Sequence, residues 1–362
     1  MPQPWNQNEV RRLLRAKTGE ERQALFDRAD AVRRKFMGDA VYLRGIIEFS
    51  NHCANDCLYC GIRASNGRVA RYRLDDENIL AVARRMTGFG QTTVVLQSGE
   101  APSPAGDVAL GKLIARIKAE TPLAVTLSVG NRSRDVYAFW RDCGLDRYLL
   151  RFETADATLF ARLHPDCTLT ARLRCLDDLR ELGIQTGSGF MVGLPGERLE
   201  TLADNILLCR EFNLDMIGLG PFLPHPDTPL GGTANGYAAD PEMHFLALAI
   251  TRLANPDAHI PATTAFDALF PNLGRNLALA RGANVFMPNA TPAEHRKDYR
   301  LYPDKPCVDE SGERCARCVV GRLAVLGRSV GTGPGHSRRG RNGFGPETSL
   351  HPGVLVLPPA RP

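Results

Sequence analysis

Three cysteines within eight positions have the spacing in this sequence that most directly predicts chemistry. Cys53, Cys57 and Cys60 lie in "NHCANDCLYCGIR" with the spacing C-x3-C-x2-C, directly after the apolar run "RGIIEFS". A structural zinc site normally takes four ligands from two paired arms, and no second arm follows nearby. Three thiolates suit a cubane iron–sulfur cluster in which one iron has no protein ligand. The loop therefore predicts a 4Fe-4S cluster whose open iron can bind a substrate or cofactor, with zinc or ordinary loop cysteines as alternatives.

A second group of three cysteines lies near the end of the chain. Cys307, Cys315 and Cys318 are spaced C-x7-C-x2-C in "CVDESGERCARC". Because no fourth ligand is obvious, a 2Fe-2S or 4Fe-4S cluster at the surface is one interpretation. Zinc with Asp309, Glu313 or water as the fourth ligand is the other. The remaining cysteines are interpreted as small apolar core residues: Cys143, Cys167, Cys175 and Cys209.

The composition of the 362-residue chain limits the classes of protein it can belong to. Its apolar content of 43% and charged content of 23% are typical of a globular protein with a sizeable core. A net charge of +5, from 45 basic and 40 acidic residues, is too balanced to indicate a nucleic acid partner. No run of about 18 apolar residues predicts a membrane span, and the N-terminus lacks the apolar segment of a secretory signal. Ten cysteines in such a chain therefore indicate metal binding or catalysis in the cytoplasm rather than a disulfide framework.

Apolar, β-branched runs alternate with amphipathic helical stretches along most of the chain. The strand candidates are 41–50, 92–99, 123–130, 147–153, 185–194, 214–222, 259–266 and 283–289. Helical stretches between them include 75–90, 105–120, 170–183 and 198–213. Eight parallel βα units predict an α/β fold, a complete (β/α)8 TIM-type barrel, with an open doubly wound sheet as the alternative.

Segments before and after the predicted barrel have a different character. Residues 1–40 are expected to form N-terminal helices, over 7–36, that pack on the barrel. The barrel itself is expected over 41–328 and includes the second cysteine group. Residues 329–362 are rich in Gly, Pro and Arg without periodicity, which predicts a largely disordered C-terminal extension.

Polar residues on the inner face of the predicted strands are candidates for ligand contacts. Active sites of such barrels lie at the C-terminal ends of the strands, and the first cysteine loop starts there. Thr126 and Ser128 share one strand face by the period of two, as do Arg147, Arg151 and Glu153. Because arginine and glutamate are costly as plain core, we expect the second set to bind an anionic ligand, a buried structural ion pair being the alternative.

The first cysteine loop, with Tyr59 before its last cysteine, resembles the signature of the radical S-adenosylmethionine (SAM) superfamily. The resemblance implies that the amino and carboxylate groups of SAM chelate the open iron. It also implies that one electron from the cluster cleaves SAM into methionine and a 5′-deoxyadenosyl radical. Such a radical requires an enclosed cavity, which a complete barrel would provide.

Two further motifs resemble those with which the superfamily binds SAM. Ser98, Gly99 and Glu100 in "LQSGEAP" resemble the GGE motif, whose backbone and acid hold the amino group of SAM. "GSGFMVGLPGE" resembles the GxIxGxxE motif that lies against the adenine, with Met191 and Gly193 in the matching places. The sequence departs from that motif at its acidic position, because Gly196 stands there and Glu197 follows one residue later.

Seven longer stretches together resemble the HydE family of FeFe-hydrogenase maturases. They are "IIEFSNHCANDCLYCGIR", "VVLQSGE", "DRYLLRFETA", "GFMVGLPG", "MIGLGPFLPHPDTPL", "IPATTA" and "GANVFMPN", and the resemblance spans about residues 7 to 328. It implies that Glu153 and Arg172 hold the methionyl part of SAM. The implied substrate or anion cavity is lined by Gln97, Thr126, Ser128, Arg147, Thr263, Thr264, Met287 and Tyr299.

The same resemblance implies a function in building the two-iron subcluster of the hydrogenase H-cluster. The implied substrate is a small iron complex with carbonyl, cyanide and cysteine ligands. Other hydrogenase maturases and an electron donor are the implied transient partners. Some family members carry an accessory iron–sulfur cluster on a second cysteine group. The enzyme alternatives are 3-methylornithine synthase and, more distantly, biotin synthase, and the alternative from another class is an iron–sulfur or zinc carrier.

Overall fold

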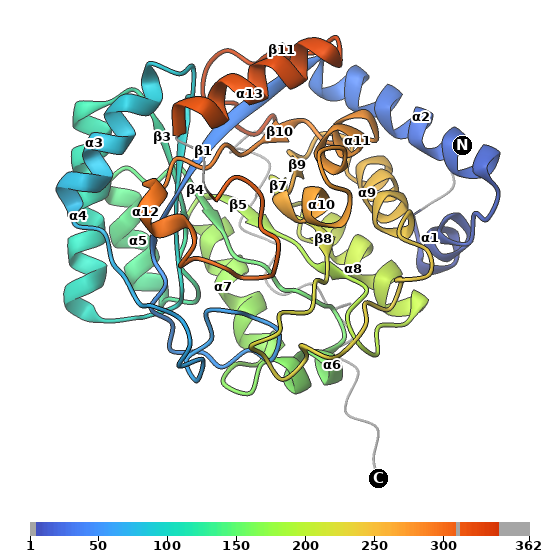
Figure 1. Ribbon diagram of the computed structural model, residues 1–362, viewed down its shortest axis with the longest axis horizontal. Helices are drawn as coiled ribbons and strands as arrows, with labels where there is room; N and C mark the ends of the chain where they lie inside the picture. The colour runs from blue at the N-terminus through green and yellow to red at the C-terminus, as the bar shows by residue number, and fades with distance from the viewer. Residues whose placement is uncertain (1–4, 309–311, 340–362) are drawn as a thin grey trace.

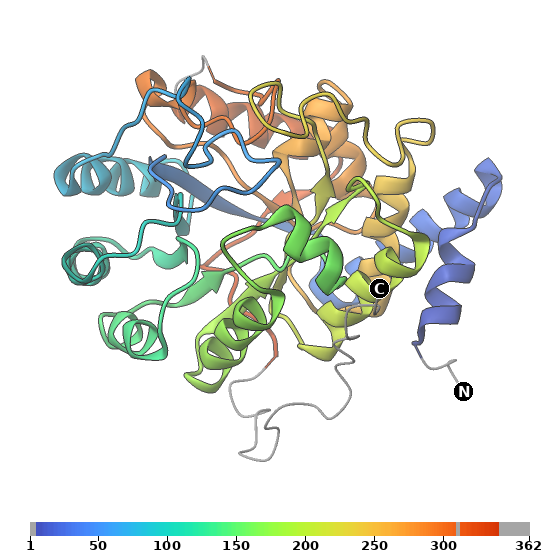
Figure 2. The same ribbon diagram turned by 90° about the horizontal axis from the view of Figure 1, so that it is seen from below.

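Eight parallel strands form a nearly closed barrel in the computed structural model, which describes residues 5–308 and 312–339 (Figures 1 and 2). The barrel strands are β1 (Ala40–Ser50), β2 (Thr93–Ser98), β3 (Ala124–Ser128), β4 (Arg147–Leu149), β5 (Gln185–Ser188), β7 (Met216–Ile217), β9 (Pro261–Ala262) and β10 (Val285–Phe286). They neighbour one another in the order β7-β5-β4-β3-β2-β1-β10-β9. The amide of Ile217 donates to the carbonyl of His259 at 2.8 Å, which joins the two end strands. The predicted barrel is therefore confirmed, and the open doubly wound alternative is wrong.

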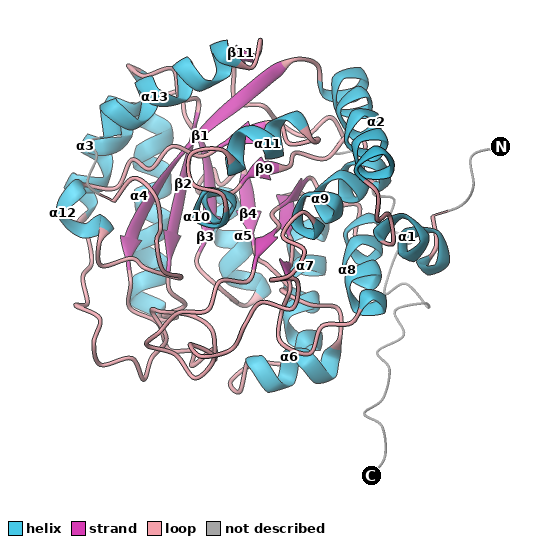
Figure 3. Ribbon diagram, turned by 45° about the vertical axis from the view of Figure 1, so that its right-hand side comes forward, coloured by secondary structure: helices cyan, strands magenta, loops and turns pink. Residues whose placement is uncertain are grey.

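Helices surround these strands on the outside (Figure 3). They are α3 (Asp76–Thr87), α4 (Pro104–Glu120), α5 (Arg134–Asp142), α6 (Ala157–Leu163), α7 (Leu169–Glu181), α8 (Leu199–Glu211), α9 (Met243–Ala254), α10 (Thr264–Leu269), α11 (Gly274–Ala280), α12 (Ala293–Arg296) and α13 (Gly312–Val325). The four predicted helical stretches correspond to α3, α4, α7 and α8. Every residue of α9 is buried, because this helix lies between the barrel and the N-terminal helices.

The later strands are shorter than their apolar runs predict. The run 185–194 splits into β5 and β6 (Met191–Val192), and 214–222 splits into β7 and β8 (Gly220–Pro221). Gly189 lies at the first break with φ 155°, and a Cβ there would lie 1.8 Å from the carbonyl oxygen of Gly218. This close approach bends both strands, so that β6 and β8 pair as a separate two-stranded sheet.

The N-terminal segment forms two helices, as predicted. These are α1 (Gln7–Leu14) and α2 (Gly19–Met37), which pack against α8 and α9. Thr18 begins α2 with a capping box, because its hydroxyl accepts from the amide of Glu21 while the Glu21 carboxylate accepts from the Thr18 amide. Among the residues that the structure describes, no helix has both the length and the apolar character needed to cross a membrane.

The start of the C-terminal extension is structured, which corrects the expectation of disorder for residues 329–339. β11 (Ser329–Val330) pairs with β1. The chain then runs along the N-terminal end of the barrel, where Arg147 Nη2 donates to the carbonyl of Pro334 at 2.7 Å. Gln185 Nε2 lies 2.8 Å from Nδ1 of His336. Side-chain contacts to the backbone order this segment, and such contacts leave no periodic signal in a sequence. Residues 340–362 lie outside the described part of the chain.

Candidate active site

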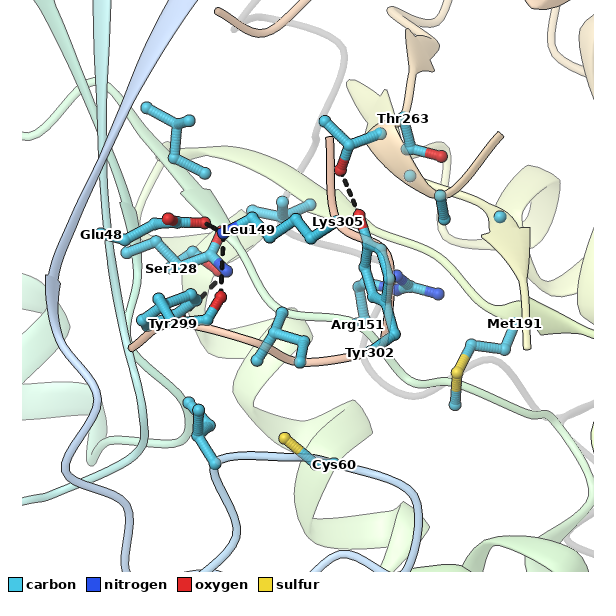
Figure 4. Close-up of a pocket in the computed structure, with 18 of the residues that line it drawn as sticks. Glu48, Cys60, Ser128, Leu149, Arg151, Met191, Thr263, Tyr299, Tyr302 and Lys305 are labelled. Carbon is cyan, nitrogen blue, oxygen red and sulfur yellow. Dashed lines mark hydrogen bonds and ion pairs between the residues drawn. The ribbon is translucent and has the colours of Figure 1, made fainter. Parts of the chain in front are cut away.

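One cavity of about 350 Å³ occupies the C-terminal end of the barrel. Its walls contain all three cysteines of the first group, and Figure 4 shows Cys60 at the bottom of the view, with Tyr299 on the left and Met191 on the right. Most predicted site residues line it: Tyr59, Gln97, Ser98, Gly99, Glu100, Ser128, Glu153, Arg172, Met191, Thr263, Thr264, Met287 and Tyr299. The barrel thus brings together residues as far apart in the sequence as Cys53 and Tyr299.

The first cysteine loop follows the C-terminal end of β1 and is tied to α6. The Leu58 amide donates to the carbonyl of Leu163 at 3.0 Å, and the Tyr59 hydroxyl lies 2.8 Å from Nε2 of His164. Burial lowers the pKa of His164 to about 4, so its ring is neutral at pH 7. Nδ1 of this neutral ring lies 3.0 Å from the Phe160 carbonyl, which assigns the proton to Nδ1 and leaves Nε2 to accept from Tyr59. These bonds fix the loop at the cavity wall, which both Tyr59 and His164 line.

Gly99, which directly follows the C-terminal end of β2, allows the cysteine loop to approach closely. A Cβ on Gly99 would lie 2.4 Å from the carbonyl oxygen of His52 and 2.8 Å from Cβ of Cys53. The Gly99 amide donates to the carbonyl of Ser50, and the Ala54 amide donates to that of Glu100. The Ser98–Gly99–Glu100 stretch and the cysteine loop are therefore one packed unit, which the two separate motifs do not reveal.

The three thiols of the first group are costly to ionise without a metal. Burial raises the pKa of Cys57, and the neighbouring Cys60 and Cys53 raise it further. Burial also raises the pKa of Cys60, to about 12. A metal cluster with positive iron ions would remove this penalty, because coordination deprotonates thiols. Among the described residues, no three His, Cys, Asp or Glu side chains are arranged to hold one metal ion. The chemistry of the donor set thus suits a multinuclear cluster, for which three thiolates are sufficient.

Charged groups on the wall beside this loop have unused hydrogen-bonding capacity. Arg151 Nη2 lies 3.0 Å from Glu153 Oε2, but the geometry makes no hydrogen bond, and both buried atoms have no other partner among the described residues. Nε of the buried Arg172 also has none. Glu153 itself has φ 64°, a strained conformation for a residue other than glycine. Buried charged atoms without a hydrogen-bond partner and a strained glutamate in one cavity indicate a polar, charged ligand.

Glu100 lies between the segment that follows β3 and helix α7. Its Oε2 accepts from the amide of Asn131 at 2.9 Å and lies 3.9 Å from Nη2 of Arg172. A carboxylate and a guanidinium therefore face the cysteines together. This is the pairing needed to receive the amino and carboxylate groups of an amino acid.

The cavity wall also contains a buried ion pair that the motifs did not predict. Nζ of Lys305 contacts Oε1 of Glu48, and their side chains are only 6% and 4% exposed. Burial lowers the pKa of Lys305. Beside this pair, Gln97 Nε2 donates to the Tyr299 hydroxyl at 3.2 Å, and the Tyr302 hydroxyl contacts that of Thr264 (Figure 4). Glu48 was detectable in the sequence as a charge within the apolar run 41–50, whereas Lys305 lies in a segment without periodicity.

Three predicted site residues lie outside the cavity. Arg147 and Thr126 face the interior of the barrel at its opposite end, where Arg147 Nη1 donates to Thr93 Oγ1 at 3.1 Å. The alternation of a strand gives the face of a side chain but not its depth in the barrel, so Arg147 does not line the anion cavity. Gly193 is also absent from the wall, since its amide donates to Glu197 Oε2 at 2.7 Å. Glu197, the acid displaced by one position in that motif, thus stabilises the turn after β6.

The second cysteine group lies between this cavity and another. Cys307 and Cys315 line both cavities, whereas the exposed Cys318 lines only the second one. Cys315 and Cys318 lie three residues apart on α13, so that they share one side of the helix. Of the proposed fourth ligands, Asp309 lies outside the described residues and so does the side chain of Glu313.

Comparisons with known proteins agree with this geometry. The profile of the Radical SAM superfamily matches residues 47–209, which include the first cysteine group and Glu153. Among solved structures, methylornithine synthase has a TM-score of 0.79 at 25% identity, covering 91% of this chain and 95% of that one. The maturase HydG from Carboxydothermus hydrogenoformans has a TM-score of 0.75 at 22% identity, covering 89% and 75%, which shows the fold alone. Fold and site together define a radical SAM enzyme.

Two curated relatives resolve the family further. The FeFe hydrogenase maturase subunit HydE of Thermotoga maritima is 47% identical over 317 residues, or 88% of this chain and 89% of the relative. The 3-methylornithine synthase of Methanosarcina barkeri is 27% identical over 88% of this chain and 89% of the relative. The chain therefore belongs to the HydE family of hydrogenase maturases. The family implies a 4Fe-4S cluster and SAM as cofactors.

Proposed function

We propose that this chain cleaves SAM reductively on a 4Fe-4S cluster held by Cys53, Cys57 and Cys60. The observation that carries the proposal is the meeting of three partly buried thiols with buried atoms of Arg151, Glu153 and Arg172 that have no hydrogen-bond partner among the described residues, all in one cavity. When bound, the cluster supplies the electron that breaks a C–S bond of SAM, giving methionine and a 5′-deoxyadenosyl radical. An external one-electron donor restores the cluster.

The residues of this chain would bind and orient SAM from three sides. Arg172 is suited to its carboxylate, and Glu100 and Glu153 are suited to its amino group, because each pairing joins opposite charges in a buried place. The backbone of Ser98 and Gly99 would support the amino group. Tyr59 and Met191, which line the cavity beyond these charges, would contact the adenosine part. The barrel keeps water from the radical.

The proposed substrate is a small iron complex with carbonyl, cyanide and cysteine ligands, on the way to the two-iron subcluster of the H-cluster. The relative from Thermotoga maritima, named as a hydrogenase maturase subunit, supports this substrate class. Polar groups available to such an anionic complex are Gln97, Ser128, Thr263, Thr264, Tyr299 and Lys305. Met287 completes the wall with a soft thioether.

Partners and place of action follow from the same proposal. Other hydrogenase maturases would supply the iron complex and receive the product, and an electron donor would dock transiently. No cysteine forms a disulfide bond within the described part of the chain, and a cytoplasmic location would keep the thiols reduced. We also propose that Cys307, Cys315 and Cys318 hold an accessory 2Fe-2S or 4Fe-4S cluster, since Cys307 and Cys315 share one cavity with Cys318.

One anaerobic experiment tests the activity. The protein is reconstituted with iron and sulfide, and SAM and dithionite are added. We expect 5′-deoxyadenosine and methionine in equal amounts, and the absence of both would overturn the proposal. A co-expressed apo-hydrogenase is expected to gain activity, whereas L-lysine is expected to give no methylornithine. Conversion of lysine would instead support the synthase activity named for the relative from Methanosarcina barkeri.

A further inference from the structure

Residues 299–307, here called the wall loop, form one side of the main cavity. Figure 4 shows Tyr299, Tyr302 and Lys305 directed into it from this loop. Lys305 Nζ donates to the carbonyl of Tyr299 at 2.9 Å and contacts Glu48, so the loop is fastened to β1 at one point. The Tyr302 hydroxyl contacts Thr264 at the start of α10. The wall loop therefore determines the shape of the half of the cavity that Tyr299, Tyr302 and Lys305 line.

The wall loop ends at the first residue of the second cysteine group. Cys307 follows Lys305 after a single proline, Pro306, whose ring fixes one backbone angle. Cys307 has φ 62°, a conformation that residues other than glycine rarely adopt. Its carbonyl accepts from Nη1 of Arg296 at 3.0 Å. The Cys307 sulfur is thus connected to Lys305 by a short piece of chain with restricted backbone freedom.

A buried charged cluster joins the wall loop to α13. Arg275 Nε donates to Asp267 Oδ2 at 2.6 Å, and Arg322 Nη1 from α13 donates to the same oxygen at 3.1 Å. Nη2 of Arg275 also lies 3.8 Å from Cys307 Sγ. Arg275 and Asp267 are almost fully buried. The wall loop contains Cys307, and α13 contains Cys315 and Cys318. These two segments therefore meet at the boundary between the two cavities.

We propose that metal binding by Cys307, Cys315 and Cys318 clamps the wall loop, and thereby fixes Tyr302 and Lys305 as positioning residues of the main cavity. The second site would act on substrate placement rather than on SAM cleavage. The groups assigned to SAM lie on other elements, namely after the end of β2, after the end of β4 and on α7. Their positions should therefore not change when the second site binds metal. The clamp itself does not depend on the proposed function. Only the statement that this half of the cavity holds a substrate rests on that function.

Hydrogen–deuterium exchange of the reconstituted full-length protein tests the clamp. Cys318→Ser removes a sulfur that touches only the second cavity, and Cys143→Ser is the matched control, since Cys143 lines neither cavity. We expect Cys318→Ser to bind less iron than wild type and to exchange at least about threefold faster over 299–307, with 147–154 unchanged. Cys143→Ser should match wild type. Equal iron content, or equal exchange over 299–307, would overturn the proposal.

A second preparation keeps the test decisive if Cys318→Ser does not fold. The variant Cys53→Ser/Cys57→Ser/Cys60→Ser retains the second group alone. Adding ferrous iron and sulfide should slow exchange over 299–307, whereas unchanged exchange in the presence of bound iron, or no iron bound, would contradict the clamp. Because this variant cannot cleave SAM under the proposed function, the result is independent of that activity.

Discussion

The two cysteine groups have the same number of thiols but different surroundings. All three thiols of the first group face a cavity that also contains unpaired atoms of Glu153 and Arg172. In the second group, Cys318 is exposed on α13 and lines only the second cavity. The first loop also follows the end of β1, where a parallel barrel performs its chemistry. Ligand number alone thus does not determine the role of a site, and the neighbouring charged groups do.

The largest effect should follow from breaking the first group. We expect Cys57→Ser to lower the rate of 5′-deoxyadenosine formation by roughly a thousandfold or more, because the cluster loses one of its three ligands. Chromatography of the acid-quenched reaction measures the product. Cys143→Ser is the matched control and should retain the wild-type rate. A Cys57→Ser rate within tenfold of wild type would remove the distinction between the groups.

The anchor of the first loop should make stability depend on pH. His164 has a folded pKa of about 4, below the usual value of 6.5, so the unfolded state binds more protons between these values. Stability from this group is therefore complete above pH 6.5 and is lost as the pH falls, by about 2 kcal/mol at pH 5 and about 3 kcal/mol at pH 4. Urea unfolding at pH 7.5 and pH 5 measures the loss.

His164→Gln should reduce this pH dependence, and His52→Gln, at an exposed position, should not. The second cysteine group has no such titrating anchor in the described part of the chain, so Cys318→Ser should leave the pH dependence as it is. Equal slopes for His164→Gln and wild type would show that the histidine does not hold the loop.

A moderate effect is expected from the charged wall beside the first group. Arg172→Met should weaken SAM binding by about 10- to 30-fold, in keeping with the loss of a charge-assisted hydrogen bond. Arg174→Met is the matched control, because Arg174 is exposed on the same helix. Equilibrium dialysis with the reconstituted protein gives both dissociation constants. Equal affinities in the two variants would contradict the assignment of Arg172 to SAM.

The smallest effect is expected from the second group. Cys318→Ser should lower SAM cleavage in the absence of substrate by less than about threefold, since the groups assigned to SAM lie on other elements. The same chromatographic assay applies. A loss as large as that of Cys57→Ser would mean that the second group takes part in the cleavage itself.

Much of the fold could be predicted because buried parallel strands form continuous apolar runs. The triad's place after 41–50 and the inward side of Glu153 followed from the same pattern. The position of Arg147 along the barrel axis could not be predicted in this way. Inward and outward side chains alternate along the whole strand, and the barrel has two ends. The ion pair of Glu48 and Lys305 joins residues 257 positions apart. Residues 329–339 are ordered by isolated contacts to the N-terminal end of the barrel. Glu48 could be noticed as a charge in an apolar run, but neither its pairing with Lys305 nor the order of residues 329–339 has a local sequence signal.

The open iron of the first cluster is the central claim, and electron paramagnetic resonance tests it most directly. The variant Cys307→Ser/Cys315→Ser/Cys318→Ser, reconstituted and reduced, contains the first cluster alone. We predict a spectrum typical of a reduced 4Fe-4S cluster whose g-values shift when SAM is added, because SAM coordinates the cluster. A spectrum that SAM leaves unchanged, at a concentration that saturates binding, would contradict the account.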